Sequence, residues 1–270
     1  ARAVAERLAY SYGVGTRPQT DSLFHPFLRE PEFYTEDAAR YGGTISTWLA
    51  GPLARVMAQT GGAAPAWELT QAQARLVTER GVIGAIPEFL DAHPRQSAGI
   101  PAVGGAPVQP FSVVELIRTA MEGFVGASWP DARTLSVAPR LPESWGETRA
   151  TLRLGGGSVT LTLRQSGGDL TAEVAPTGDL PESATLRLSG TEAAVTVPLT
   201  LARGDTAVVA RDAFTVEISG ASAEVDGGDA EAEAVEPAPG VWDGFAFVEP
   251  DLRDEYPVMR AVEERRDFSA

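Results

Sequence analysis

The chain of 270 residues is 43% hydrophobic and has no cysteine, so it can bury cores in two folded parts but cannot form disulfides or thiolate metal sites. Its 37 acidic residues outnumber its 22 basic residues, all of them arginine, and the resulting net charge of −15 would repel the phosphates of nucleic acid. No apolar run approaches the roughly 20 residues of a membrane helix and the start lacks a signal-peptide pattern, so we expect a soluble, cytoplasmic protein without a membrane partner.

Apolar residues recur at helical spacing through the first half of the sequence. The pattern predicts helices at about residues 1–11, 44–60, 66–80, 84–91 and 109–125. The first of these has no capping residue before it, which predicts that the sequence is a processed product or a fragment. Long irregular connections between helices are uncommon unless they have a function, so the proline-rich and glycine-rich stretches at 13–31 and 94–107 are the first places to look for a site.

From about Ser128 the helical spacing gives way to short alternating runs separated by turn residues. These runs lie at about residues 152–154, 159–163, 170–174, 184–188, 194–199, 207–209 and 214–218. The pattern is typical of an antiparallel β-sandwich of seven or eight strands, so we expect a two-part α+β chain. The predicted division is a helical part at 1–128, a β-sandwich at 129–220, an acidic flexible linker at 221–240, and a docking segment with a tail at 241–270.

Three blocks of the helical part, and one at its junction with the strands, carry a recognisable pattern. The first, His25 to Pro52, is an aromatic-rich loop that leads into a helix near Thr44 and ends TWLAGP. The second, GAIPEFLDAHP from Gly84 to Pro94, places Glu88 between a proline and a phenylalanine. The third, VQPFSVVELIR from Val108 to Arg118, can open a helix because proline is tolerated in the first turn, and a further block runs from Thr134 to Arg164.

From His25 to Arg118 the chain resembles the closing portion of the catalytic helical domain of bacterial glycogen-debranching enzymes of the amylo-α-1,6-glucosidase type. The Thr134 to Arg164 block resembles the sequence that opens the following β-domain in these enzymes. The resemblance therefore implies the C-terminal part of an (α/α)6 toroid followed by a β-domain. The chain departs from the family pattern where Tyr41 and Gly42 replace a histidine and an asparagine, and where Ser46 and Phe111 each replace a tryptophan.

This family resemblance implies a glycoside hydrolase portion that hydrolyses α-1,6-linked glucose at branch points of a glycogen-like α-glucan with inversion. Glu88 is then the catalytic base, which activates water while a second acid about 6.5–9.5 Å away protonates the leaving oxygen. The implied substrate-binding residues are Tyr41, Thr44, Trp48, Gln109 and Phe111. No cofactor or metal is implied.

The toroid has twelve helices and the chain supplies about five, so the resemblance implies a protein partner or self-association that completes it and supplies the acid. The alternative is a degenerate, non-catalytic carbohydrate-binding or scaffold protein of the same fold, which the replaced sugar-site residues favour. We expect Asp37 and Asp91, the carboxylates near the base in sequence, to be solvated or capping residues. His25 and His93 lack the carboxylate spacing of a metal site.

Overall fold

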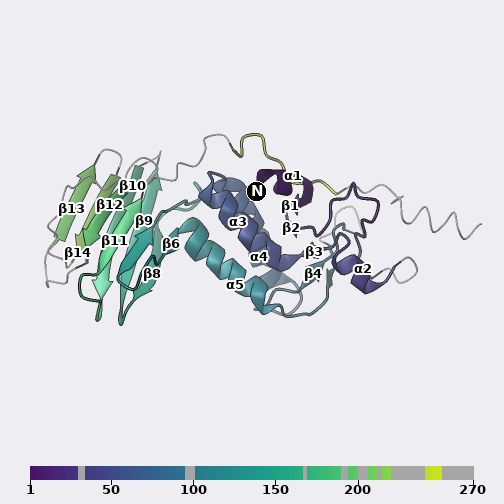
Figure 1. The fold of residues 1–270 in the computed structure, drawn as a ribbon, viewed down its shortest axis with the longest axis horizontal. Coiled ribbons are helices and arrows are strands. Elements are labelled where there is room, and N and C mark those ends of the chain that lie inside the picture. Colours follow the sequence, from purple (N-terminus) through teal and green to yellow (C-terminus); the bar gives the residue numbers. More distant parts are fainter. Residues whose placement is uncertain are drawn as a thin grey trace, which may run out of the picture. The chain divides into compact units, whose positions relative to one another are not determined.

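The computed structural model of the chain divides into two compact units (Figure 1). The helical unit comprises Ala1–Met57, Pro65–Thr119 and the segment from Val241, and the β unit comprises Ala58–Ala64 and Ala120–Gly240. The residues that the structure describes are 1–29, 34–94, 101–166, 169–189, 194–199, 206–211, 214–219 and 241–250. The predicted linker at 221–240 and the predicted tail after residue 250 lie outside them.

Five α-helices are found in the described part of the N-terminal half, which together with the strands that follow confirms the mixed α+β class. They are α1 (Arg2–Leu8), α2 (Glu36–Arg40), α3 (Ala50–Gln59), α4 (Ala63–Glu79) and α5 (Pro110–Arg118). A 3₁₀ turn at Thr47–Leu49 leads into α3, and a π-helical turn at Thr119–Phe124 follows α5. The described helices do not show a closed toroid, and none of them is long and apolar enough to cross a membrane.

The helices predicted at 1–11, 44–60, 66–80 and 109–125 correspond to α1, α3, α4 and α5. Helix α2 was not predicted. It begins after Thr35, whose hydroxyl accepts a hydrogen bond from the N–H of Ala38 at 3.2 Å, and two acidic residues in its first turn favour the positive end of the helix. A short polar helix of this kind has too few apolar residues to show a helical period.

The helix predicted at 84–91 is wrong. Gly84 has a φ of +87°, a left-handed conformation that a continuing helix does not adopt. Strand β4 (Phe89–Leu90) follows and pairs antiparallel with β3 (Ile45–Ser46) on one side and β5 (Val103–Gly104) on the other. This sheet joins the first and second sequence blocks through β3 and β4. The third block meets them through the N–H of Gln109, which donates to the carbonyl of Ile86 at 2.7 Å.

The core of the helical unit forms around that sheet and the hairpin of β1 (Ala9–Tyr10) and β2 (Gly13–Val14). Its buried cluster consists of Tyr10, Phe24, Ile45, Leu76, Ile86, Leu90 and Ala92. Val248 packs against this cluster, and its N–H donates to the carbonyl of Ala9 at 2.7 Å. Residues 241–250 therefore belong to the helical unit although they follow the β unit in sequence.

The β unit contains two sheets whose strands alternate between buried and exposed positions. The first sheet has the order β13 (Thr206–Arg211), β14 (Phe214–Ser219), β10 (Asp169–Thr177), β9 (Gly157–Ser166) and β8 (Thr148–Leu154). The second has the order β12 (Ala194–Pro198), β11 (Thr185–Ser189), β7 (Thr134–Val137) and β6 (Ala127–Ser128). All seven predicted runs fall on β8 to β14.

Pairing in these sheets is mostly antiparallel, as predicted, with one exception in each. Strand β10 pairs parallel with β14, and β7 pairs parallel with β11. Each sheet buries one face, for example at Leu152, Leu154 and Leu161 in the first sheet and at Leu135 and Leu186 in the second. The alternation of the sequence thus reports burial of one face per strand, while the direction of the partner strand is set by contacts that are distant in sequence.

Candidate functional site

The candidate base, Glu88, immediately precedes β4, and its backbone is held on both sides. Its N–H donates to the carbonyl of Ala106 at 2.9 Å, and its carbonyl accepts from the N–H of Thr47 at 3.2 Å. The first contact continues the β4–β5 pairing and the second continues the β3–β4 pairing. The main chain at Glu88 is therefore fixed by the sheet rather than by a loop of its own.

The carboxylate of Glu88 is also held in place, and its side chain is 23% exposed. Its Oε2 accepts from the N–H of Ala106 at 2.9 Å and lies 3.5 Å from Nη1 of Arg40. Gly105 has a φ of +68°, and a Cβ added there would lie 2.7 Å from Oε2, so the glycine permits the close approach of the loop. Among the described residues, no hydrogen bond to Oε1 is found, which leaves one oxygen of a fixed carboxylate for water.

Arg40 links Glu88 to helix α2. The guanidinium donates to Glu36 at 2.9 Å and lies 5.4 Å from the centre of the Phe89 ring. The hydrogen bond with Glu36, followed by the charge of Glu88, raises the pKa of Arg40 above its ordinary value. The arginine is therefore a permanent positive charge beside Glu88, and nothing in the sequence patterns pointed to it.

Thr47 is a second residue that sequence reasoning missed. It is buried, and its hydroxyl lies 2.6 Å from the carbonyl of Pro87 and 2.8 Å from the hydroxyl of Ser112. Since a hydroxyl has one hydrogen, Thr47 donates to Pro87 and accepts from Ser112. The chain of hydrogen bonds connects the 3₁₀ turn, the segment that carries Glu88, and α5.

Three of the five predicted sugar-binding residues present aromatic rings to solvent. Tyr41 is 76% exposed, Phe111 70% and Trp48 42%. Tyr41 lies at the C-terminal end of α2, Trp48 in the 3₁₀ turn beside Thr47, and Phe111 in the first turn of α5. Tyr41 lines an open groove of about 470 Å³ whose other lining residues are Val4, Leu8, Val14, Gly15, Thr16, Leu49, Pro52 and Leu53.

The remaining two predicted sugar-binding residues have structural contacts. Thr44 is fully buried, and its hydroxyl donates to the carbonyl of Ala39 at 2.8 Å, so it supports the loop that carries Tyr41. Gln109 precedes α5, and its backbone N–H donates to the carbonyl of Ile86 at 2.7 Å, while its side chain makes no capping hydrogen bond. The amide of Gln109 is therefore not used to cap its helix.

The two other carboxylates have the environments expected of structural residues. Asp91 is buried and its Oδ1 accepts from the N–H of Leu28 at 2.8 Å. The side chain of Asp37 is 94% exposed in the first turn of α2, 3.8 Å from Nε of Arg40. Neither carboxylate has the half-buried, independent position that a general acid needs to protonate a leaving group.

The two histidines are held by aromatic contacts and burial in the core of the helical unit. His25 stacks on Tyr34 with ring centres 4.1 Å apart, and burial lowers its pKa from the ordinary value. His93 is fully buried, 5.3 Å from the Phe24 ring centre to centre. Across the described part of the chain, no group of three or more His, Cys, Asp or Glu side chains could hold a metal ion.

In comparisons with known proteins, no model of a protein family matches the chain, and no curated protein matches it. The resemblance to debranching glucosidases therefore rests on the sequence blocks alone. What the geometry adds is a carboxylate fixed at the meeting point of those blocks, with exposed aromatic rings at Tyr41 and Trp48 in the first block and at Phe111 in the third.

Proposed function

We propose that the chain is a portion of a glycoside hydrolase that hydrolyses α-1,6-linked glucose at branch points of an α-glucan with inversion. In this proposal the helical unit is the closing part of an (α/α)6 toroid and the two sheets of the β unit form a β-sandwich. The observation that carries the proposal is the fixed carboxylate of Glu88, which is held through Oε2 by Ala106 and Arg40 where the three blocks meet.

The chemistry assigned to Glu88 is general base catalysis. One carboxylate oxygen removes a proton from water as the water attacks the anomeric carbon from the face opposite the leaving oxygen. A donor and a cation on Oε2 hold the group in one orientation, so that Oε1 can be directed at that water. The lone pair that binds the proton then needs no reorientation during the reaction.

The exposed rings of Trp48, Tyr41 and Phe111 support sugar binding, since sugars present C–H faces that pack on aromatic rings. The amide of Gln109 can form hydrogen bonds with hydroxyl groups, and the contacts of Thr44 give it a supporting role. This arrangement supports a glucan or oligosaccharide as the ligand of the helical unit.

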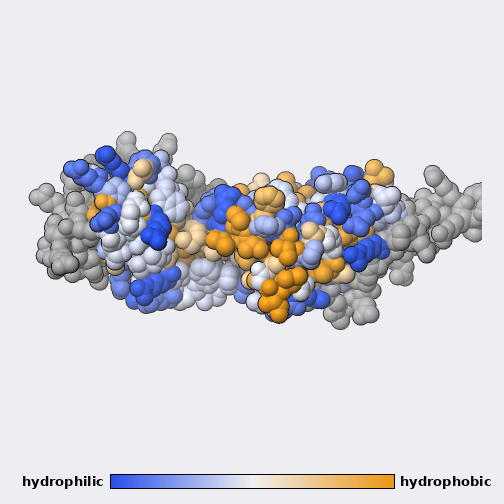
Figure 2. All heavy atoms as spheres, turned by 90° about the horizontal axis from the view of Figure 1, so that it is seen from below, coloured by the Kyte–Doolittle hydropathy of each residue, from blue (hydrophilic) through white to orange (hydrophobic). Residues whose placement is uncertain are grey.

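The proposal also requires further helices and a general acid from another polypeptide or another copy of the chain. Exposed apolar residues on α5 support such a contact. Val114 and Ile117 lie three residues apart and are 51% and 59% exposed. Figure 2 shows apolar surface gathered over the helical unit on the face seen there, as expected for a surface that another helix covers.

The alternative function is carbohydrate binding without hydrolysis. It is supported by the structural roles of Asp37 and Asp91, which leave the described residues near Glu88 without an evident acid. It is also supported by Arg40, because its guanidinium lies 3.5 Å from the carboxylate of Glu88 and the two can form a purely structural ion pair. The two functions predict different consequences of the same substitution.

The test is hydrolysis of a branched α-glucan by the native assembly, whose intact mass is measured first to show whether other chains are present. We expect Glu88→Gln to lower the rate at least the roughly 10²-fold attributed to a general base, with glucan binding retained. Glu36→Gln is the matched control, because Glu36 is the other glutamate paired with Arg40, is exposed and should be dispensable for the rate. Unchanged hydrolysis in Glu88→Gln would rule out the role given to Glu88. Binding without hydrolysis in the native assembly, weakened by Trp48→Ala, would establish the alternative.

A further inference from the structure

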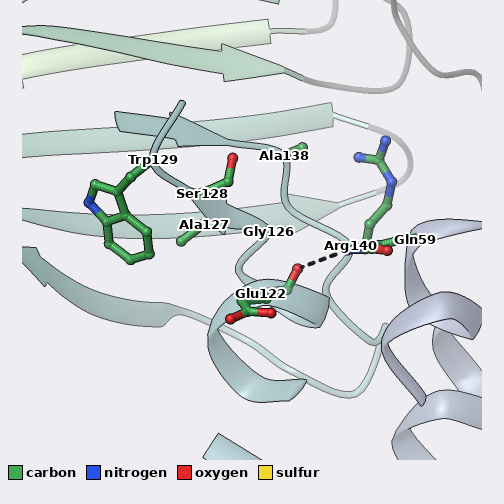
Figure 3. A pocket seen from close by; sticks show the side chains of 8 residues that line it. All are labelled: Gln59, Glu122, Gly126, Ala127, Ser128, Trp129, Ala138 and Arg140. Carbon is green, nitrogen blue, oxygen red and sulfur yellow. Dashed lines mark hydrogen bonds between the residues drawn. The ribbon is translucent and has the colours of Figure 1, made fainter. Parts of the chain in front are cut away.

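The β unit contains a cavity of about 540 Å³ that the proposed hydrolytic site does not use (Figure 3). Its lining residues are Gln59, Glu122, Gly126, Ala127, Ser128, Trp129, Ala138 and Arg140. All eight belong to the same compact unit. The volume falls within the roughly 300–1,000 Å³ of small-molecule sites, so a ligand larger than a bound ion fits.

Trp129 gives the cavity an aromatic wall that is both exposed and fixed. The side chain is 45% exposed, and its Nε1–H donates to the carbonyl of Arg153 at 2.8 Å. An indole that already has its hydrogen bond loses little conformational freedom when a ligand packs on its face. Large exposed rings normally attract a second apolar surface, and a sugar ring offers one on its C–H face.

Behind this wall, the backbone segments at Gly126 and Ala138 approach each other closely. Gly126 has a φ of +71°, and a Cβ added there would lie 1.9 Å from the carbonyl oxygen of Ala138. The N–H of Ala138 in turn donates to the carbonyl of Gly126 at 3.0 Å. The close approach of these two segments shapes the cavity before a ligand binds. Such preorganisation reduces the entropy lost on binding and so raises affinity.

Polar groups at the other end of the cavity can both donate and accept. In Figure 3, Trp129 lies at one end of the lining and Gln59 and Arg140 at the other, with Glu122 between them. The amide nitrogen of Gln59 donates to the carbonyl of Glu122 at 3.5 Å, a long hydrogen bond that fixes the amide only weakly. Ser128 adds an exposed hydroxyl.

Arg140 lines the cavity with a guanidinium that is only partly hydrogen-bonded by the described residues. Its Nη1 donates to the carbonyl of Pro139 at 2.8 Å, but its Nε is buried and has no hydrogen-bond partner within the described ranges. Burial lowers the pKa of this guanidinium from the ordinary arginine value. Because Nη1 and Nε are engaged or buried, Arg140 can offer a ligand only the donors of its guanidinium that face the cavity.

The charges of the lining select the class of ligand. The charges of Glu122 and Arg140 cancel, so the lining of the cavity does not attract anions. The net charge of the whole chain, −15, repels them. A carboxylate and a guanidinium are instead strong acceptors and donors for neutral hydroxyl groups. We propose that this cavity is a binding site for a neutral oligosaccharide, which packs a sugar face on Trp129 and places hydroxyls against Glu122 and Arg140.

The proposal does not depend on Glu88 or on hydrolysis, so it can fail or succeed independently of the function proposed above. The full chain, labelled with ¹⁵N in its five tryptophans, is titrated with tetrasaccharides of glucose in α-1,4, α-1,6 and β-1,4 linkage and with a mannose tetrasaccharide, each to ~10 mM, an upper range for weak sites. The indole signal of Trp129 is identified by its loss in Trp129→Phe. We expect at least one sugar to shift this signal in a saturable manner.

Substitutions then assign the site. In a Trp48→Ala background, which weakens the site proposed in the helical unit, Trp129→Ala should lower the affinity measured by calorimetry at least ~10-fold, and Glu122→Gln several-fold, because stacking and a charge-assisted hydrogen bond are lost. Trp48→Ala, in the helical unit, should leave the titration of the Trp129 signal unchanged, and thermal unfolding checks that each variant folds. The proposal is overturned if no neutral sugar shifts the signal, if the affinity in the Trp48→Ala background survives Trp129→Ala in a folded protein, or if a glucuronate oligomer titrated in the same way is the only sugar that binds.

Discussion

Replacement of Thr47 by valine removes one buried hydroxyl that connects three segments of the helical unit. Thr47 and Ser112 are 1% and 3% exposed, so water cannot replace the lost hydrogen bonds to Pro87 and Ser112. Each such bond contributes about 1 kcal/mol net, and the groups left without a partner add a desolvation cost, so we expect a loss of about 2–3 kcal/mol in the free energy of unfolding. Ser112→Ala removes only one bond and should cost about 1 kcal/mol.

The assay is urea denaturation followed by circular dichroism at 222 nm, where the signal comes from the helices of this unit. The double variant Thr47→Val/Ser112→Ala should lose about as much free energy of unfolding as Thr47→Val alone, because it leaves no serine hydroxyl without a partner. The two substitutions are then coupled by about 1 kcal/mol. Thr78→Val on the exposed face of α4 is the matched control and should change stability by less than about 0.5 kcal/mol. Additive effects of the two substitutions, or a loss in Thr47→Val no larger than in the control, would refute the hydrogen-bond chain.

Three further predictions concern single residues. Burial, with a smaller effect of Arg17, lowers the pKa of His25, so as the pH falls the unfolded chain binds the proton before the folded chain does. The free energy of unfolding of wild type should therefore fall below about pH 6.5, relative to that of His25→Phe, when both are denatured across pH 5–8. Gly126→Ala should lower the melting temperature and alter the cavity, since its Cβ would clash with the Ala138 carbonyl, and an unchanged melting temperature would contradict this. Leu161→Ala, at a fully buried position of β9, should cost about 2–5 kcal/mol in urea denaturation, whereas a cost below 1 kcal/mol would argue against the packed sheet face.

The fold could be predicted where burial follows a simple period. The β unit alternates buried and exposed side chains along β8 and β11, and the sequence shows that alternation directly. Ile86, Phe89 and Leu90 have the spacing of a helix face, but they are buried by the β3–β4–β5 sheet. A short apolar run fits both structures, and the choice is made by partner strands that come from other parts of the chain.

The candidate site shows the same limit. Glu88 could be selected from the sequence because the resemblance carries it, but the groups that hold it could not. Arg40 and Ala106 lie 48 and 18 residues away from it along the chain, and no local pattern links such positions. The burial of Thr44 could not be foreseen either. Its hydroxyl donates to the carbonyl of Ala39, five residues earlier in the last turn of α2, and no sequence pattern marks that contact.

The route of the chain makes the main part of the β unit, Ala120–Gly240, an insertion within the helical unit. The chain leaves the helical unit after Thr119 and rejoins it at Val241, where Trp242 is 8% exposed and Val248 is hydrogen-bonded to Ala9. A protease that cuts only one of these two connections leaves the β unit attached through the other. After a cut at the first connection, the β unit would separate only if residues 241–250 also left the core of the helical unit, so a nicked protein should still migrate as one particle under native conditions.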